Sequence, residues 1–343
     1  MGDISLPPFE RYKDHDVVRF KEVHPNFLRR ALRFGYQLEV GLNHFGKGLK
    51  ICHFRDPWSG VPILRAVGRQ VRTVYEVNGL PSIELPSAFP SVGRETLDKI
   101  RDAEEFCWSR ANVIITPSQT IADNLISLGV QGTRIEVIPN GAHLVQVVPY
   151  LSDQPYLIYF GALQPWQGVD ILLKAFARLR DLTDLRLMIC SSVKEKRARP
   201  LHKLALKLGV SERIDWRYRL SRQELAPLVA GALLSIAPLT ECARNLDQGC
   251  CPLKILESMA LGTPVVASDL PAIREIIEDG KDGKLVRADR PAELSRAIRI
   301  LLEYPMLRAR LGVAARQKVA QEFRWDIILD KLDKVYSKLM DSF

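Results

Sequence analysis

No stretch of this chain is apolar enough to cross a lipid bilayer, which takes a helix of roughly 20 residues. The longest uncharged run, residues 225–240, fits a helix followed by a buried strand better. The first residues, Met1–Pro8, lack the basic start and the apolar centre of a secretory signal peptide. We therefore expect a cytoplasmic protein.

Cysteine is scarce and shows no ligand spacing. The six cysteines in 343 residues include no Cys-x-x-Cys pair. In so long a chain this argues for reduced thiols and against a disulfide framework or a zinc site. The sequence also lacks a Ser/His/Asp or Cys/His set in a context that would support nucleophilic catalysis.

Acidic residues are fewer than basic ones, and the formal net charge is +9. The densest basic segments, Phe27–Arg33 and Lys194–Arg199, lack the aromatic spacing of a base-stacking module. We therefore expect no nucleic-acid partner. A solvated basic surface is our first interpretation of these segments, and peripheral contact with the inner membrane face is the second.

A chain of this length suits two domains. Short apolar runs alternate with helical periodicity along it, which predicts two doubly wound α/β domains built on parallel sheets. They join near Gln146–Pro155, a segment that holds three turn formers, so we expect domains at 1–148 and 149–325. Ligands of such sheets bind at the carboxyl ends of the strands, so the cleft between the domains is the expected site.

The most informative segment is Asn245–Ser268. Pro252 and Gly262 predict the start and the end of a helix, and a short buried strand follows. The backbone amides of Gly249, Cys250 and Cys251 precede the helix, where its dipole favours a phosphate. Lys254 and Glu257 are three residues apart and share a helix face. A phosphate site, a cation and a carboxylate that can accept hydrogen bonds from two hydroxyls together suit a nucleotide diphosphate.

Several motifs of the C-terminal half occur in a fixed order. They are Ile135–Gly141, Tyr159–Gly161, Gly168–Phe176, Leu256–Ser268, Glu275–Gly280 and Asp282–Val286. In order and spacing they resemble the retaining glycosyltransferases of family 4. The resemblance implies a GT-B fold, in which two Rossmann-like domains face a cleft and the C-terminal domain binds a nucleotide-sugar donor. Residues 326–343 resemble the tail helix that returns to the first domain in such proteins.

The resemblance also implies roles for individual residues. Glu257 matches the carboxylate that holds the donor ribose, since its two oxygens accept hydrogen bonds from a cis-diol. The Gly249–Cys251 amides match the loop under the donor diphosphate, and Leu253 joins them in the expected nucleotide-binding set. Gly161 matches the glycine that lets the donor approach the backbone.

On the acceptor side, Asn78 stands where the family often has a histidine near the reacting carbon. An Asn-Gly turn is the structural alternative for Asn78-Gly79. Glu76 precedes Asn78 and is expected to point to the other face if the strand persists. Glu84 and the loop Arg55–Gly60 follow strand ends and are expected to line the acceptor side.

Four departures from the family pattern bear on activity. Gly249 stands where the partner acidic residue of Glu257 belongs, and Ala162 and Gln167 replace the usual diphosphate cations. A diphosphate needs a positive partner in a cleft, so we expect Arg244 and Lys254 to serve, with Arg222 as a weaker candidate. The fourth departure is that the first βα unit is missing. The first convincing strand is Asp16–Phe20, so we expect exposed apolar surface in the first domain.

Three hypotheses follow. The first is a retaining hexosyltransferase that moves a hexose from a UDP- or GDP-sugar to a saccharide or lipid-linked acceptor, with Asn78, Lys254 and Arg244 as candidate catalytic residues. The resemblance implies neither a metal nor an organic cofactor, and Asp14-His15-Asp16 is interpreted as a turn. The second is a catalytically inactive GT-B protein that serves as a partner or regulator. The third, disfavoured by the resemblance, is another enzyme on this fold, such as a sugar-nucleotide epimerase.

Overall fold

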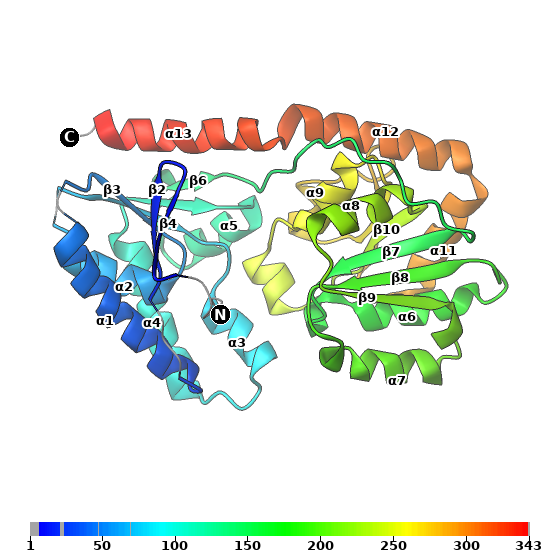
Figure 1. The fold of residues 1–343 in the computed structure, drawn as a ribbon, viewed down its shortest axis with the longest axis horizontal. Helices are drawn as coiled ribbons and strands as arrows, with labels where there is room; N and C mark the ends of the chain where they lie inside the picture. The colour runs from blue at the N-terminus through cyan, green and yellow to red at the C-terminus, as the bar shows by residue number, and fades with distance from the viewer. Residues whose placement is uncertain (1–6, 21–23, 47, 69, 342–343) are drawn as a thin grey trace.

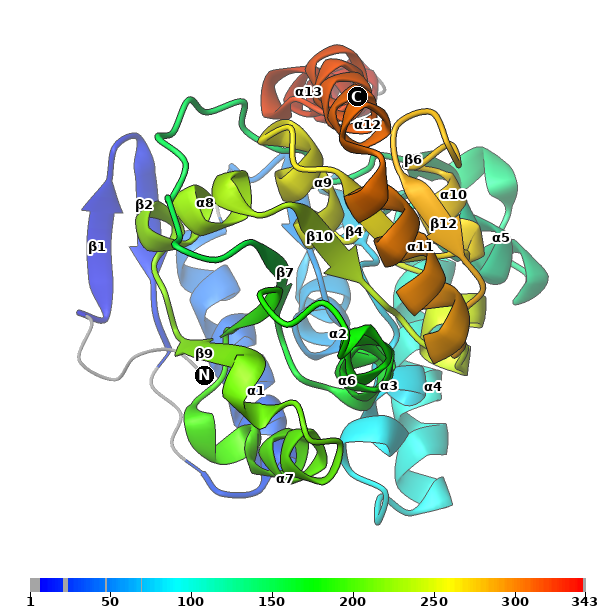
Figure 2. The same ribbon diagram turned by 90° about the vertical axis from the view of Figure 1, so that its right-hand side faces the viewer.

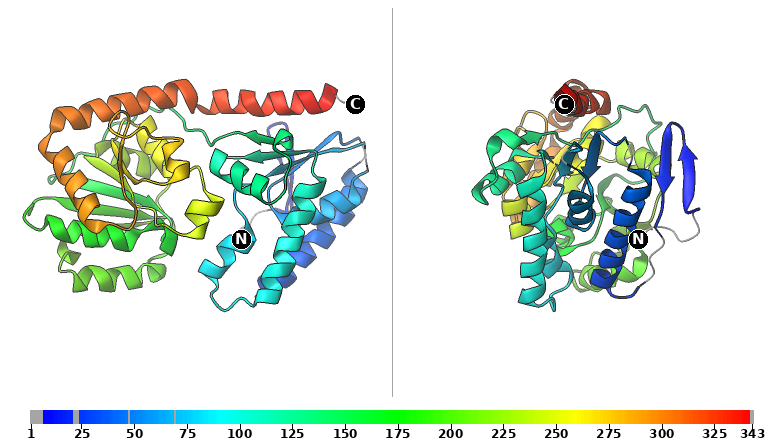
Figure 3. Two further views of the ribbon diagram at one scale, coloured as in Figure 1. Left: turned by 180° about the vertical axis from the view of Figure 1, so that it is seen from behind. Right: turned by 90° about the vertical axis from the view of Figure 1, so that its left-hand side faces the viewer.

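The computed structural model describes residues 7–20, 24–46, 48–68 and 70–341. Two parallel sheets lie side by side, each with its own helices, and a pair of long C-terminal helices runs across both (Figure 1). Seen from behind, the same helix pair spans the two halves along one edge (Figure 3).

The first sheet has four parallel strands in the order β3-β4-β5-β6. Their bounds are β3 Ile51–Phe54, β4 Arg72–Glu76, β5 Val113–Thr116 and β6 Ile135–Val137. The helices of this half are α1 Phe27–Phe45, α2 Pro57–Ala66, α3 Pro81–Ala88, α4 Arg94–Arg110 and α5 Gln119–Ser127. Among the described residues β3 forms one edge of the sheet.

The strand expected at Asp16–Phe20 begins one residue earlier, at His15, and ends at Val18. Residues β1 Phe9–Tyr12 and β2 His15–Val18 form a separate antiparallel hairpin, which stands at the side of the molecule (Figure 2). Lys13 takes a φ of +52° in its turn, and Arg11 pairs with Asp16 at 3.1 Å. The acidic pattern at residues 14–16 therefore lies in a hairpin turn and the strand after it.

Two helices of the first half differ from the sequence expectation. The residues after Arg55 were expected to form a loop, but α2 begins at Pro57 because Asp56 caps it, accepting a hydrogen bond from the Ser59 amide at 2.8 Å. Helix α3 was not expected at all. The buried carboxylate of Glu104 on α4 holds the first turn of α3. It accepts hydrogen bonds from the Ser82 amide at 2.8 Å and from the Ser82 hydroxyl at 2.6 Å.

The second sheet has six parallel strands in the order β12-β11-β10-β7-β8-β9. They are β7 Tyr156–Gly161, β8 Arg186–Ser191, β9 Ile214–Tyr218, β10 Leu234–Ala237, β11 Val265–Ser268 and β12 Lys284–Val286. Its helices are α6 Val169–Phe176, α7 Arg199–Lys207, α8 Arg222–Gly231, α9 Leu253–Ala260, α10 Pro271–Arg274 and α11 Pro291–Glu303. A π-helical turn, Arg244–Gln248, precedes α9.

Alternate residues of the central strands face opposite cores, as expected of a sheet covered on both sides. Leu157 and Tyr159 of β7 belong to one buried cluster, and Ile158 and Phe160 of the same strand belong to another. Near-continuous apolar runs of this kind are why the strands of this half could be predicted from the sequence.

Two chain crossings join the halves, and they are hydrogen-bonded to each other. The segment 139–155 leads from β6 to β7, and α12 Pro305–Glu322 is followed by α13 Trp325–Asp341, which returns to the first sheet. The Ala142 amide donates to the Phe323 carbonyl at 2.7 Å between the two crossings. Val335 and Leu339 of α13 pack on Val74 and Ile115, so the tail helix covers one face of the first sheet.

Candidate functional site

A cleft of about 420 Å³ opens between the two sheets. Residues that follow the carboxyl ends of strands from both halves line it, which is where doubly wound sheets bind ligands. They are Arg55, Asn78, Pro117, Asn140, Phe160, Gly161, Gln167, Leu239, Arg244, Cys250, Cys251, Pro252, Leu253, Lys254 and Glu257. Of the expected site residues, Asn78, Gly161, Arg244, Cys250, Cys251, Leu253, Lys254 and Glu257 are in this set, whereas Gly249, Glu84 and Arg222 are not.

Lys254 of α9 lines the cleft from the second half of the chain. Its ammonium donates to Gln167 Oε1 at 2.5 Å and to the Tyr159 hydroxyl at 3.1 Å, and it lies 4.2 Å from the centre of the Tyr159 ring. Burial lowers the pKa of Lys254 to about 7. Gly161 has a φ of +126°, and a Cβ there would lie 3.4 Å from the Lys254 ammonium. The glycine therefore leaves open the space beside this cation.

The contact between Lys254 and Gln167 concerns the diphosphate cations of the family, which Ala162 and Gln167 replace in this sequence. Gln167 stands where the resemblance places a lysine, and the structure brings the Lys254 ammonium to the same corner from helix α9. A cation is therefore present near Gly161 although it comes from another part of the sequence.

Glu257 faces Arg222 across the mouth of the cleft, with 3.2 Å between Oε1 and the guanidinium. Burial raises the pKa of Glu257, and the nearby Arg222 charge partly opposes that shift. Beyond Glu257 lies a cavity of about 340 Å³, lined mainly by apolar side chains that include Phe160, Leu225 and Val229. A carboxylate at the entrance of an apolar cavity suits a ribose joined to a flat base.

The loop before α9 is tied to the first half of the chain. The Asn140 amide group donates to the Cys251 carbonyl at 2.8 Å. Helix α9 begins at Leu253 with Pro252 as its N-cap, and no side chain caps its first amides. The Cys250 and Cys251 thiols are buried, which raises the pKa of both. The loop thus presents backbone, rather than reactive thiolates, to the cleft.

Gly249 lies outside the cleft, against the start of α5. Its φ is +73°, and a Cβ there would approach two atoms of Thr120 at 2.8 and 2.9 Å. A glutamate with this backbone would collide with the first half of the chain. Glycine at this position is therefore required by the contact between the halves.

Arg244 is enclosed by the first half of the chain. Its Nε lies 3.4 Å from Glu84 Oε1, its guanidinium lies 5.8 Å from the centre of the Trp166 ring, and its side chain is only 15% exposed. The neighbouring Gln248 accepts from the Leu80 amide at 2.8 Å and donates to Glu84 at 2.9 Å. The π-helical turn thus interlocks with α3, and Glu84 already balances the Arg244 charge.

Asn78 follows β4 and faces the cleft with its side chain held from behind. Its Nδ2 donates to Glu76 Oε1 at 2.7 Å, and Arg55 pairs with the same oxygen at 3.2 Å. The expectation that Glu76 points to the other face is wrong. Side chains two positions apart in an extended chain lie on the same side, so Glu76 and Asn78 meet.

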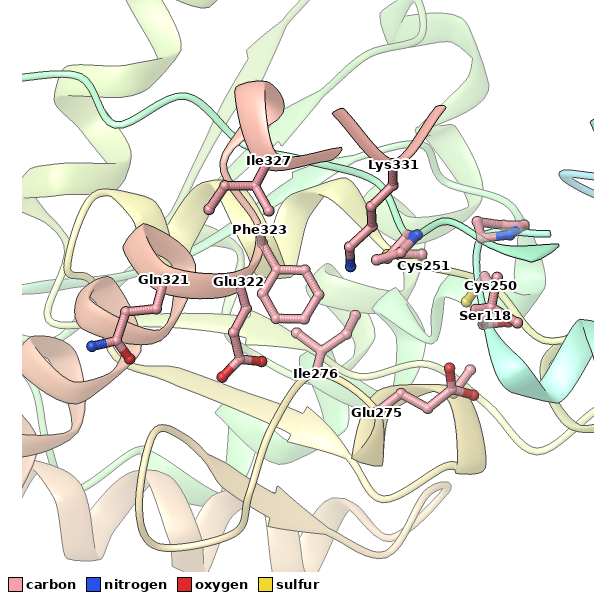
Figure 4. Close-up of a pocket in the computed structure, with 14 residues that line it drawn as sticks. Ser118, Cys250, Cys251, Glu275, Ile276, Gln321, Glu322, Phe323, Ile327 and Lys331 are labelled. Carbon is pink, nitrogen blue, oxygen red and sulfur yellow. The ribbon is translucent and has the colours of Figure 1, made fainter. Parts of the chain in front are cut away.

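A second contact between the halves lies behind the loop at 250–251. Glu275 accepts hydrogen bonds from the Gln119 and Thr120 amides and from the Thr120 hydroxyl at 2.7 to 2.9 Å, so it caps α5 across the interface. A cavity of about 360 Å³ lies beside it, and Lys331 of α13 points into this cavity (Figure 4).

Sequence reasoning missed Tyr159 and Gln248 and, for Glu84, which was expected on the acceptor side, the pairing with Arg244. Tyr159 lies inside an apolar strand, and Gln248 is an uncharged residue in a loop. Their roles depend on contacts with residues more than 80 positions away, such as Gln248 with Leu80. Only the position of Tyr159 just before Gly161 gave a local signal.

Two family descriptions match the chain. Glycosyl transferases group 1 matches residues 146–318, and Glycosyltransferase Family 4 matches residues 4–146. The first match covers half of the chain. The protein belongs to the family 4 glycosyltransferases.

Curated relatives agree with this assignment. The chain is 31% identical over 231 residues to the MMP alpha-(1->4)-mannosyltransferase of Mycolicibacterium hassiacum, which covers 66% of this chain and 54% of that protein. It is 33% identical over 262 residues to the D-inositol 3-phosphate glycosyltransferase of Streptomyces bingchenggensis, which covers 70% of this chain and 56% of that protein. The chain thus spans about half the length of the curated relatives it matches.

Solved structures confirm the predicted GT-B fold. Sucrose-phosphate synthase of Thermosynechococcus elongatus superposes with a TM-score of 0.82 at 18% identity, over 99% of this chain and 88% of that chain. HepE of Anabaena, crystallised with UDP and glucose, superposes with a TM-score of 0.74 at 19% identity, over 91% of this chain and 83% of that chain.

Two features are absent from the described residues: a group of metal ligands and a membrane-spanning helix. No group of three or more His, Cys, Asp or Glu side chains in the described part of the chain could hold a metal ion. Within the same residues, no helix has the length and apolar character needed to span a membrane.

Proposed function

We propose that this protein transfers a hexose from a UDP- or GDP-sugar to a saccharide or lipid-linked acceptor, with retention of configuration. The observation that carries the proposal is the Lys254 ammonium beside Gly161 and Gln167, where a donor diphosphate needs a cation. The crystallised complex of HepE with UDP and glucose, on the same fold, supports a nucleotide-sugar donor. The names of the curated relatives support a sugar-containing or lipid-linked acceptor.

The proposed chemistry is mainly electrostatic. The bond between the anomeric carbon and the diphosphate oxygen breaks while the acceptor hydroxyl forms a new bond on the same face. The hydroxyl proton passes to the leaving diphosphate. Lys254, the amides at the start of α9 and Arg244 neutralise the charge that develops there, so the proposal needs neither a metal nor an organic cofactor.

Two ion pairs must rearrange when the donor binds. Glu257 has to exchange Arg222 for the ribose hydroxyls, and Arg244 has to share its charge between Glu84 and the diphosphate. Arg222 and Glu84, the present partners of Glu257 and Arg244, both carry exposed surface, so water can solvate their charges when the pairs separate.

The test is calorimetric titration with UDP and with GDP, followed by a screen of nucleotide sugars for nucleotide release. We expect one nucleotide to bind, and Glu257→Ala to weaken it roughly 10- to 100-fold because the ribose loses a charged acceptor. If neither nucleotide gave heat and the variant behaved like the parent protein, the transferase proposal would fail.

An inactive partner or regulator is the second candidate. Gly249 in place of a carboxylate and the pairing of Arg244 with Glu84 favour it. Nucleotide binding without turnover of any nucleotide sugar, in the presence of glycolipid and oligosaccharide acceptors, would support this candidate over the first.

Peripheral contact with the inner membrane face is part of the proposal. Leu32, Tyr36 and Val40 of α1 are 75, 70 and 52% exposed and are spaced by four residues, so they share a helix face. Arg29 precedes them by one turn, which suits an anionic lipid surface. Sedimentation with phosphatidylglycerol vesicles tests this contact, and Leu32→Asp should abolish it while phosphatidylcholine vesicles bind neither protein.

A further inference from the structure

A row of polar side chains connects the tail helix to the acceptor side of the cleft. The Tyr336 hydroxyl of α13 lies 2.6 Å from His53 Nδ1, and His53 Nε2 lies 3.2 Å from Glu76 Oε2. Glu76 Oε1 accepts from Asn78 Nδ2 at 2.7 Å. The row therefore ends at a residue that lines the cleft.

The chemistry of each group fixes the direction of these hydrogen bonds. An ionised carboxylate only accepts, so Glu76 selects the NH2 end of the Asn78 amide. His53 touches both neighbours: its Nδ1 shares a hydrogen bond with the Tyr336 hydroxyl, and its Nε2 lies in close polar contact with Glu76 Oε2. Burial would raise the pKa of Glu76, but the hydrogen bonds from His53 and Asn78 and the charge of Arg55 lower it, which keeps the carboxylate ionised.

The orientation of Asn78 has a chemical consequence. With one of the two Nδ2 protons donated to Glu76, the plane of the amide is fixed, and Oδ1 is an acceptor with no proton to give. Such an oxygen can accept a hydrogen bond from a sugar hydroxyl and turn the hydroxyl lone pairs toward an electrophilic carbon. It cannot stabilise a leaving oxygen, which needs a donor.

We propose that Glu76 is a positioning residue for the acceptor: it holds Asn78 so that Oδ1 meets the attacking hydroxyl, and His53 and Tyr336 fix Glu76 from helix α13. The inference rests on the proposed glycosyl transfer. It assigns to the tail helix a part in catalysis, through contacts that cross 283 positions of sequence between His53 and Tyr336.

The first experiment measures nucleotide release from the donor that the screen identifies. Glu76→Leu should lower kcat roughly 10- to 100-fold, as loss of a supporting residue commonly does, and should leave the Kd for free nucleotide within twofold. Glu76→Gln keeps an acceptor and should retain more activity. Glu105→Gln, at an exposed position on α4 of the same half, is the matched control and should not change kcat.

A double variant separates positioning from general damage. If Glu76 acts through Asn78, then Glu76→Leu should cause little further loss in an Asn78→Ala background. Additive losses in the double variant, or an unchanged kcat in Glu76→Leu, would overturn the inference.

The second experiment needs no turnover, so it separates failure of this inference from failure of the proposed function. In protein labelled with 15N-asparagine, the side-chain amide signal of Asn78 is assigned by its loss in Asn78→Ala. We expect this signal to shift in Glu76→Leu and, less, in Tyr336→Phe. Tyr304→Phe, at a 60% exposed tyrosine outside the row, is the control and should leave it in place. An unshifted signal in Glu76→Leu would refute the positioning role even if the donor binds.

Discussion

The two sheets of this protein obtain their cores in different ways. The second sheet has six strands, and buried clusters on both faces are built from its own helices. The first sheet has four strands, with one well-filled face, and on the other face Val74 and Ile115 are covered by Val335 and Leu339 of α13. The donor side is thus self-sufficient, whereas the acceptor side depends on the last helix of the chain.

The same contrast applies to the cleft. Lys254 and Glu257 come from one helix of the second half, whereas Asn78 is held through His53 and Tyr336 by α13. We therefore expect perturbations of α13 to affect the acceptor side and to spare the donor side.

The largest effect should come from removing α13. A chain that ends at Arg324 exposes Val74 and Ile115, and we expect β3 to β6 to lose their protection from hydrogen exchange while β7 to β9 keep theirs. Exchange measured by mass spectrometry reads both sheets in one sample. Equal protection of the two sheets after the deletion would contradict the comparison. Leu339→Ala is a milder perturbation of the same contact and should lower the free energy of unfolding by about 2–5 kcal/mol.

The second prediction concerns Lys254 and sharpens the independence of the donor side. Lys254→Met should weaken UDP or GDP binding roughly 100-fold, because a diphosphate in the cleft loses its nearest cation. The effect should be the same size in the protein that lacks α13.

The pH dependence of nucleotide binding follows from the same residue. The pKa of Lys254 is lowered to about 7, so the free protein loses this charge above that pH. A bound diphosphate favours the charged form, and binding then requires proton uptake. The Kd should therefore rise about tenfold per pH unit above pH 7, until the pKa of the complex is reached. In Lys254→Met this rise should vanish. A flat profile in the parent protein would show that Lys254 does not meet the diphosphate.

The third prediction tests the contact between the halves at Gly249. Gly249→Ala should lower the free energy of unfolding by about 1–3 kcal/mol, from a strained φ and a collision with Thr120. Gly280→Ala is the matched control, since Gly280 has a φ of +75° but no atom within 4 Å of its Cβ position. An equal loss in the two variants would mean that Thr120 moves aside at no cost.

The smallest effect is expected at Glu275. Glu275→Gln weakens the cap on α5. It should lower the free energy of unfolding by about 1 kcal/mol, because a helix cap typically contributes that much. Small-angle scattering should show a slightly larger radius of gyration if the contact keeps the halves together. Glu278→Gln is the control, because Glu278 is an exposed carboxylate three positions after Glu275 and pairs with Lys281.

The sequence predicted the elements whose signal is local. The strands of the second sheet could be predicted because they are short apolar runs, and the order of the later motifs indicated the GT-B fold. Residues Arg55–Gly60 were expected to form a loop because Asp56-Pro57 fits a turn as well as a helix cap. The strand expected at Asp16–Phe20 belongs to a hairpin, which alternation does not reveal because it does not name the partner strand.

The site was predicted less completely than the fold. Lys254 and Glu257 were found because they share one helix with a proline start. The partners that set their charge, Gln167 and Arg222, and the pairing of Arg244 with Glu84, depend on contacts between distant segments. The orientation expected for Glu76 was wrong because residues two positions apart in a strand share a face. Local periodicity carries no information on such contacts.

The two chain crossings between the halves meet at one place, where the Ala142 amide donates to the Phe323 carbonyl and the Trp325 ring packs on Gly141. Any rotation about this place that opens the cleft must also break the contacts of Glu275 with Thr120 and of Gln248 with Leu80. Closure restores all of these contacts at once, so the position of Asn78 relative to Lys254 is set by the whole interface between the halves.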